Sequence, residues 1–167
     1  MWRSLSLLIF LLVVGGCAIF VLLSSAALGP VVASHFAASG QANGFAPHAV
    51  YVNFMLGMLV VAPSLAVFVP RLGINRPNAR INLPNGAYWL APERRQATID
   101  TLCAHMAVFG TLLALFLTYV HSMVVEANQH VPPNLPADAF IKAMLGFVGA
   151  VAVWLALLFW RFRRVEA

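Results

Sequence analysis

Four long apolar stretches, separated by short polar segments, constrain the fold of this chain more than any other feature. Each is long enough to cross the hydrocarbon core of a bilayer, which takes about 20 apolar residues in a helix. With only 9% charged residues, the chain cannot cover a globular surface with polar groups, since soluble domains carry about 25%. We therefore expect an all-α integral membrane protein, one domain (1–167) built as a four-transmembrane-helix bundle. The expected helices lie near residues 5–28, 49–70, 92–127 and 138–162.

The basic residues are arranged so that they orient these stretches. Nine of the ten Lys and Arg residues form three clusters, at the two chain ends and between the second and third stretches. Cytoplasmic loops are enriched in Lys and Arg. We therefore expect both termini and the inner loop (71–91) in the cytoplasm (N-in/C-in), with outer loops at 29–48 and 128–137, in a bacterial inner membrane. The clusters are Arg3; Arg71, Arg76, Arg80, Arg94 and Arg95; and Arg161, Arg163 and Arg164.

The first apolar stretch also has features of a cleaved leader. Arg3 precedes the apolar run, and the segment from Val14 to Cys17 loosely resembles a lipoprotein cleavage box. Signal-peptide apolar regions are roughly 7–15 residues long, whereas this run continues to Leu28. We expect a retained membrane helix, with cleavage as the alternative.

The first outer loop carries several turn signals. Pro30 ends the first helix. Gly40 and the pair Asn43-Gly44 accept positive φ at little cost. We expect a compact folded cap rather than a flexible linker. The candidate ligand- or partner-binding residues of this cap are His35, Phe36, Gly40, Asn43 and Gly44.

The inner loop is the second candidate place for function. Pro84-Asn85-Gly86 predicts a turn, so we expect a short hairpin or an interfacial loop. Tyr88 and Trp89 are expected at the level of the lipid headgroups. Five arginines bracket this turn, which suits anionic headgroups or a cytoplasmic partner. The candidate residues here are Arg80, Asn82, Asn85, Tyr88 and Trp89.

The third helix is the most polar of the four. A stripe of small and hydroxylated residues follows a 3.6-residue period, which is typical of a helix packed centrally in a bundle. The alternative is a polar pathway for an ion or small solute. Asp100 lies near the inner surface, where Arg71 or Arg95 is expected to neutralise it. The intramembrane polar candidates are Asp100, His105, Thr111, Thr118 and His121.

The remaining histidines do not have the spacing of a metal site. His35, His48, His121 and His130 belong to the outer side with Glu126, but no HxxxH or CxxC pair occurs. The sequence also lacks the nucleophile, phosphate-loop and zinc-protease motifs of common enzymes. We expect no catalytic residue, no metal and no cofactor, and therefore no enzyme.

The first outer loop has a pattern of its own. Pro30, the pair His35-Phe36, Gly40 and the pair Asn43-Gly44 lie between two apolar stretches. This pattern resembles a bacterial membrane domain of unknown function, which also occurs at the start of SdpI-type toxin-immunity and signalling proteins. The resemblance covers roughly residues 27–72. It implies a membrane architecture, with His35 and Phe36 as candidate functional positions and nothing catalytic.

The inner loop and the chain length qualify this resemblance. The run from Ile81 to Asn85, followed by Tyr88-Trp89, looks like the loop of short relatives that carry this domain. SdpI-type proteins have a further multi-span domain, and this chain is too short for both parts.

Three classes of function fit these observations. We favour a non-enzymatic binding, sensing or immunity-related module. The alternatives are a small transporter or channel subunit lined by the third helix, and a structural subunit of a larger membrane complex. The expected partners are the lipid bilayer and a protein partner or second copy. Nucleic acid is not expected, because the arginines flank apolar stretches and no basic patch with interleaved aromatics occurs.

Overall fold

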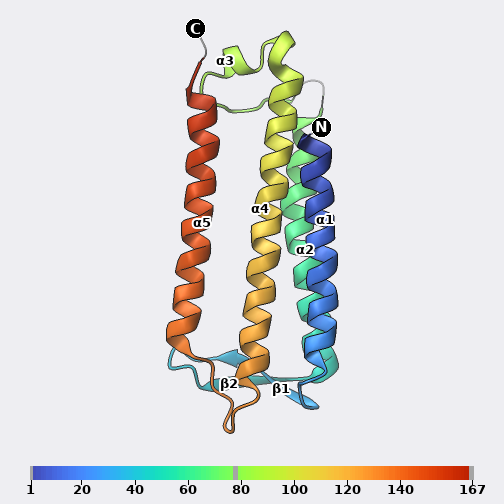
Figure 1. Cartoon of the computed structure of the whole chain (residues 1–167), viewed down its shortest axis with the longest axis vertical. Coiled ribbons are helices and arrows are strands. Elements are labelled where there is room, and N and C mark those ends of the chain that lie inside the picture. The colour runs from blue at the N-terminus through green and yellow to red at the C-terminus, as the bar shows by residue number, and fades with distance from the viewer. Residues whose placement is uncertain (1, 77–78, 166–167) are drawn as a thin grey trace.

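A computed structural model describes residues 2–76 and 79–165 of the chain. Four of its helices are long and apolar enough to cross a membrane, and they run side by side along the long axis (Figure 1). The chain order is α1 (Trp2–Ser25), β1 (Val31–Phe36), β2 (Ala42–Pro47), α2 (His48–Ile74), α3 (Gly86–Trp89), α4 (Pro92–Ala127) and α5 (Ala137–Arg163). The structure is therefore mainly helical, as the apolar stretches predict.

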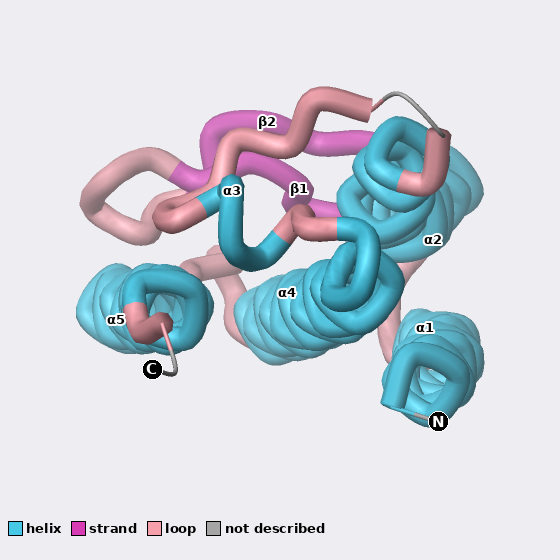
Figure 2. The backbone as a smooth tube through the Cα atoms, turned by 90° about the horizontal axis from the view of Figure 1, so that it is seen from above, coloured by secondary structure: helices cyan, strands magenta, loops and turns pink. Residues whose placement is uncertain are grey.

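Three of the long helices form the core. α1 and α2 both pack on α4, whereas α5 lies on the other side of α4 from α1 (Figure 2). Small residues on α4 allow this close approach: Ala107 and Ala114 are fully buried. A side chain at Gly110 would overlap Val67 of α2 and Phe10 of α1. The small-residue stripe of α4 thus includes the surface on which the bundle is assembled.

α5 contacts the bundle through aromatic side chains. Phe116 and Phe147 stack with ring centroids 4.4 Å apart, and Phe109 lies 5.1 Å from Trp154. Of the residues described in α5, Phe162 alone is buried. Most of the α5 surface is therefore free to face lipid.

The loop between α1 and α2 adds a small two-stranded sheet to the all-α bundle, which the prediction did not include. β1 and β2 pair antiparallel, with Val31 opposite Pro47 and Ala33 opposite Phe45, and the register shifts around His35. The hairpin lies across the ends of the helices opposite α3 (Figure 1). The expected compact cap is therefore a two-stranded sheet.

The segment between α2 and α4 also differs from the expected loop at 71–91. α2 continues to Ile74, and the Pro84-Asn85-Gly86 turn leads into the single-turn helix α3 instead of a hairpin. Asn85 starts this turn with φ 52°, in the left-handed region that asparagine tolerates. The starts of α1 and α4 and the end of α5 lie at this same end of the bundle (Figure 1).

The helix bounds follow the apolar stretches with small shifts. α1 begins at Trp2 and ends at Ser25, three residues earlier at both ends than the expected 5–28. α2 and α5 are longer than the expected 49–70 and 138–162. These shifts leave the order of the four predicted spans unchanged.

Candidate functional site

A pocket of about 470 Å³ lies at the hairpin end, where β1 meets the ends of α4 and α5. His35 and Phe36 of β1 line it, so the structure brings two of the predicted cap residues to one cavity. Its other walls are mainly apolar and include Val120, Val124, Leu135, Phe140 and Ile141. We call this cavity the cap pocket. Its size lies within the range of small-molecule sites, about 300–1,000 Å³.

The polar edge of the cap pocket is formed by His35 and its neighbour. His35 is exposed, and its Nδ1 lies 3.0 Å from the Ser34 hydroxyl. Gly44 sits opposite on β2, where an added Cβ would come within 2.9 Å of the His35 Cβ. Asn43 is exposed on β2 and is not among the lining residues of the cap pocket.

Asn128, at the end of α4, holds the hairpin in place. Its Oδ1 accepts a hydrogen bond from the Ala33 N–H at 2.8 Å, and its Nδ2 donates to the Ala33 carbonyl at 3.0 Å. A second contact joins the hairpin turn to the loop between α4 and α5, since the Leu135 N–H donates to the Gly40 carbonyl at 2.8 Å. Gly40 has φ 87°, and a side chain there would overlap the Leu135 carbonyl. The hairpin is therefore held by hydrogen bonds both to the end of α4 and to the loop between α4 and α5.

A buried polar network lies just inside the cap. His121 of α4 is fully buried, with the Ser24 hydroxyl of α1 2.9 Å from Nε2 and the Tyr51 hydroxyl of α2 2.9 Å from Nδ1. The Ser24 hydroxyl donates its proton to the Phe20 carbonyl at 2.6 Å, so it accepts from Nε2–H. The other ring nitrogen, Nδ1, pairs with the Tyr51 hydroxyl. His121 thus connects all three core helices.

At the opposite end, Asp100 is paired, but not with the expected residue. Its Oδ1 accepts from Arg3 Nη1 at 3.1 Å and from Gln96 Nε2 at 3.0 Å, so the prediction of Arg71 or Arg95 as its partner is wrong. The Arg3 and Asp100 side chains are 36% and 42% exposed, which makes this a partly solvated ion pair. Arg71 is buried instead, with its Nη2 donating to the Arg3 carbonyl at 3.4 Å.

The predicted inner-loop residues divide into two groups. Asn85 and Trp89 both bind the end of α5: Asn85 Nδ2 donates to the Arg163 carbonyl at 2.9 Å, and Trp89 Nε1 to the Phe162 carbonyl at 2.8 Å. Trp89 is buried against Phe162, and its expected level among the lipid headgroups stays a prediction. Tyr88 is half-buried beside it, under the Arg94 guanidinium. Arg80 and Asn82 are exposed, and so is Asn85 despite its hydrogen bond to α5.

The other intramembrane candidates have local roles. The Thr111 and Thr118 hydroxyls donate to the Ala107 and Ala114 carbonyls of their own helix, at 2.9 and 2.8 Å. His105 faces Trp154, whose Nε1 donates to the His105 carbonyl at 3.1 Å. Its Nδ1 is buried and has no hydrogen-bond partner in the described part of the chain.

The histidines, cysteines and acids do not gather at one point. Across residues 2–76 and 79–165, no three of these side chains form a group that could hold a metal ion. His48 illustrates their separate roles, since its Nε2 lies 3.0 Å from the Ser25 carbonyl at the end of α1.

Ser24, Tyr51 and Asn128 were not singled out from the sequence. Each contacts a residue 70 to 97 positions away in the chain, and no spacing rule connects such pairs. A polar residue inside an apolar stretch was the available signal for Ser24, and one just beyond a helix end was the signal for Asn128.

Comparison with known proteins identifies no family for this chain. No family model matches the chain, and no curated protein and no solved structure matches it. The observations on fold and site therefore define its class as a protein with four apolar, membrane-competent helices.

Proposed function

We propose that this chain is a non-enzymatic binding and sensing module of a bacterial inner membrane, and that its ligand occupies the cap pocket. The cap pocket carries this proposal, because it joins an apolar cavity to a polar edge at the outer ends of α4 and α5. Such a cavity suits a small amphipathic ligand, whose apolar body packs on Val124 and Phe140 while its polar group binds His35.

The proposed orientation is N-in and C-in. It is supported by the nine clustered arginines, which all belong to the end of the bundle opposite the hairpin. Alkaline phosphatase inserted at Asn43 should be active, and green fluorescent protein fused after Val165 should fluoresce. The opposite pair of signals would overturn the orientation.

The proposed sensing mechanism uses α5. Ala137 and Phe140 at its start line the cap pocket, whereas its far end is held by Asn85 and Trp89 of the inner loop. Since most of α5 is not buried, a ligand that wedges against its first turns has little packing to displace. A shift of α5 would then move the inner loop, and a cytoplasmic partner bound to this loop can respond to that movement.

Photocrosslinking in living cells tests the cap pocket. The photoreactive residue p-benzoylphenylalanine replaces Phe36, which lines the pocket, or Phe45, which is 59% exposed on the other strand and serves as the control. We expect a small adduct of defined mass at position 36 that is absent at position 45. Bulk phospholipid adducts of equal yield at both positions would overturn the proposal.

The alternative functions have less support than ligand binding in the cap pocket. A transport pathway along α4 would need polar groups free to meet a solute, but the Thr111 and Thr118 hydroxyls bind their own helix. The resemblance to the membrane domain of SdpI-type proteins stays a prediction, and the immunity role that it suggests depends on it. Identification of the adduct at Phe36 would separate a toxin fragment from a small metabolite.

A further inference from the structure

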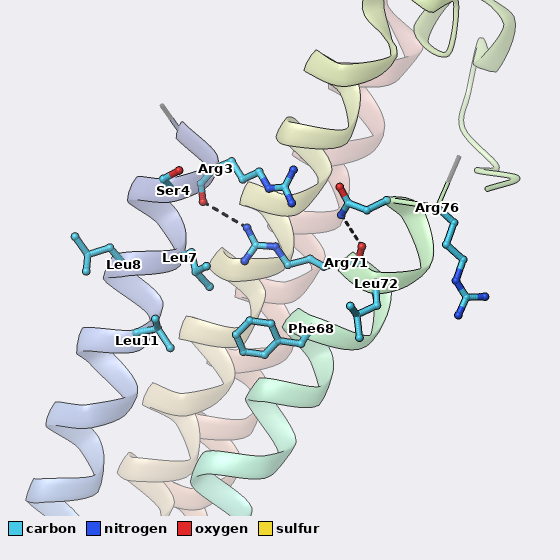
Figure 3. A pocket seen from close by; sticks show the side chains of 10 residues that line it. Arg3, Ser4, Leu7, Leu8, Leu11, Phe68, Arg71, Leu72 and Arg76 are labelled. Atoms are coloured by element: carbon cyan, nitrogen blue, oxygen red, sulfur yellow. Dashed lines mark hydrogen bonds between the residues drawn. The ribbon is translucent and has the colours of Figure 1, made fainter. Parts of the chain in front are cut away.

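α1 and α2 frame an open pocket of about 800 Å³ at the end of the bundle that carries α3. We call it the arginine pocket (Figure 3). Three arginines line it, Arg3 from α1, Arg71 from α2 and Arg76 just beyond α2. The apolar wall is made by Leu7, Leu8, Leu11, Phe68 and Leu72.

Arg71 is the unusual member of this pocket. It is only 6% exposed, and its side chain extends from α2 toward α1, where Nη2 donates to the Arg3 carbonyl (Figure 3). Nη1 is buried and has no hydrogen-bond partner within the described part of the chain. A buried charged group with one donor left unpaired is costly. Native structures rarely leave such a group unsatisfied, so a missing partner is the natural explanation.

The charges around Arg71 indicate the sign of that partner. Asp100 is the acid paired at this end, and its Oδ1 is occupied by Arg3 and Gln96. Three arginines against one carboxylate leave an excess of two positive charges. An anion therefore complements the site, and the planar guanidinium favours phosphate oxygens.

The apolar wall indicates that this anion belongs to a lipid. Leu8, Leu11 and Leu72 are 54%, 50% and 70% exposed, and they continue from the arginines along the apolar helices. A free phosphate ion would leave this surface uncovered, whereas acyl chains would cover it. Basic pockets between membrane helices are known to hold anionic lipid headgroups.

We infer that the arginine pocket binds an anionic phospholipid, whose phosphate pairs with the Arg71 guanidinium and whose acyl chains lie along the leucines of α1. The cap pocket is at the other end of the bundle, so the two proposals can fail separately. The bound lipid would join α1 to α2 at their inner ends.

Native mass spectrometry of the purified full chain in a neutral detergent tests this inference. The chain is titrated with phosphatidylglycerol or with phosphatidylcholine of the same acyl chains, and inorganic phosphate is added as a competitor. We expect one phosphatidylglycerol to bind about tenfold more tightly than phosphatidylcholine, because the choline cation of phosphatidylcholine is repelled by the excess positive charge of the pocket. Inorganic phosphate at millimolar concentration should not displace it.

Variants locate the site. Arg71→Gln should bring the two lipids to within about threefold of each other, and Arg71→Lys should keep an intermediate preference. Arg164→Gln is the matched control, because Arg164 is at the same end of the bundle but stacks on Trp160 outside the pocket. It should change the affinity less than about twofold, as for a screened surface charge.

Three results would overturn the inference. Equal affinity for the two lipids would remove the anionic site, and full displacement by inorganic phosphate would assign it to a free ion. Equal losses in Arg71→Gln and Arg164→Gln would mean diffuse attraction by the basic end. The comparisons on the unaltered chain decide the question even where Arg71→Gln does not fold.

Discussion

Tyr51 and His121 are joined by a 2.9 Å hydrogen bond and by stacked rings whose centroids are 5.8 Å apart. With Ser24 on the other ring nitrogen, this pair connects α1, α2 and α4 inside the apolar bundle. The network is complete, because each ring nitrogen of His121 has one partner. A satisfied network of this kind stabilises one arrangement of the helices rather than a pathway for protons.

The network predicts a graded loss of stability. Tyr51→Phe should lower the free energy of unfolding by about 1 kcal/mol, within the range for single hydrogen bonds between membrane helices. His121→Leu should cost about 2 kcal/mol, since it removes two bonds and leaves the Tyr51 hydroxyl unsatisfied. Unfolding in mixed micelles measures both values. Tyr119→Phe, at a half-exposed position on the same helix, should change less than about 0.5 kcal/mol.

The close packing around Gly110 predicts that a larger side chain at this position destabilises the centre of the bundle. A Cβ there would overlap Val67 and Phe10, so Gly110→Val should destabilise the chain by about 1–3 kcal/mol through overpacking. The same change at Gly57 is the control, because nothing lies within 4 Å of a Cβ at that position. Equal effects at the two glycines would show that backbone propensity, and not helix contact, decides the outcome.

The long helices could be predicted from the sequence because apolar length alone determines a membrane span. The helix rotations could not, because four apolar helices offer many faces of similar hydrophobicity. Asp100 illustrates this: its partner Arg3 is 97 residues away and depends on how α1 and α4 face each other. The network around His121 was missed for the same reason.

The hairpin could have been predicted from the sequence. Two six-residue strands flank the turn that contains Gly40, a spacing typical of hairpins with a longer loop. This signal is weak, because apolar and polar residues do not alternate regularly in either strand. The role of Trp89 was missed because an aromatic residue near a basic loop suits the headgroup region equally well.

Asn128 predicts a local effect on the cap. Asn128→Ala removes both hydrogen bonds to the Ala33 backbone and should cost about 1–2 kcal/mol of local stability. Amide hydrogen exchange in residues 30–47 should then become about tenfold faster, while exchange in α2 stays unchanged. Asn43→Ala, at an exposed position of β2, should leave exchange in the hairpin as it is. Faster exchange throughout the bundle would contradict a role confined to the cap.

The hydrogen bonds from the inner loop to the end of α5 lead to a prediction about the local stability of that helix end. Asn85→Ala loses the hydrogen bond to Arg163 and places a less tolerant residue at positive φ, while Trp89→Phe loses the bond to Phe162. Each change should cost about 1 kcal/mol and so raise the open population of this segment about fivefold. Trypsin cleavage after Arg161 or Arg163 should accelerate in proportion, since cleavage follows the open form when closing is fast. Asn82→Ala, at an exposed position of the same loop, is the control and should leave the cleavage rate unchanged. Equal acceleration of cleavage in Asn82→Ala would show that the hydrogen bonds of Asn85 and Trp89 do not hold the end of α5.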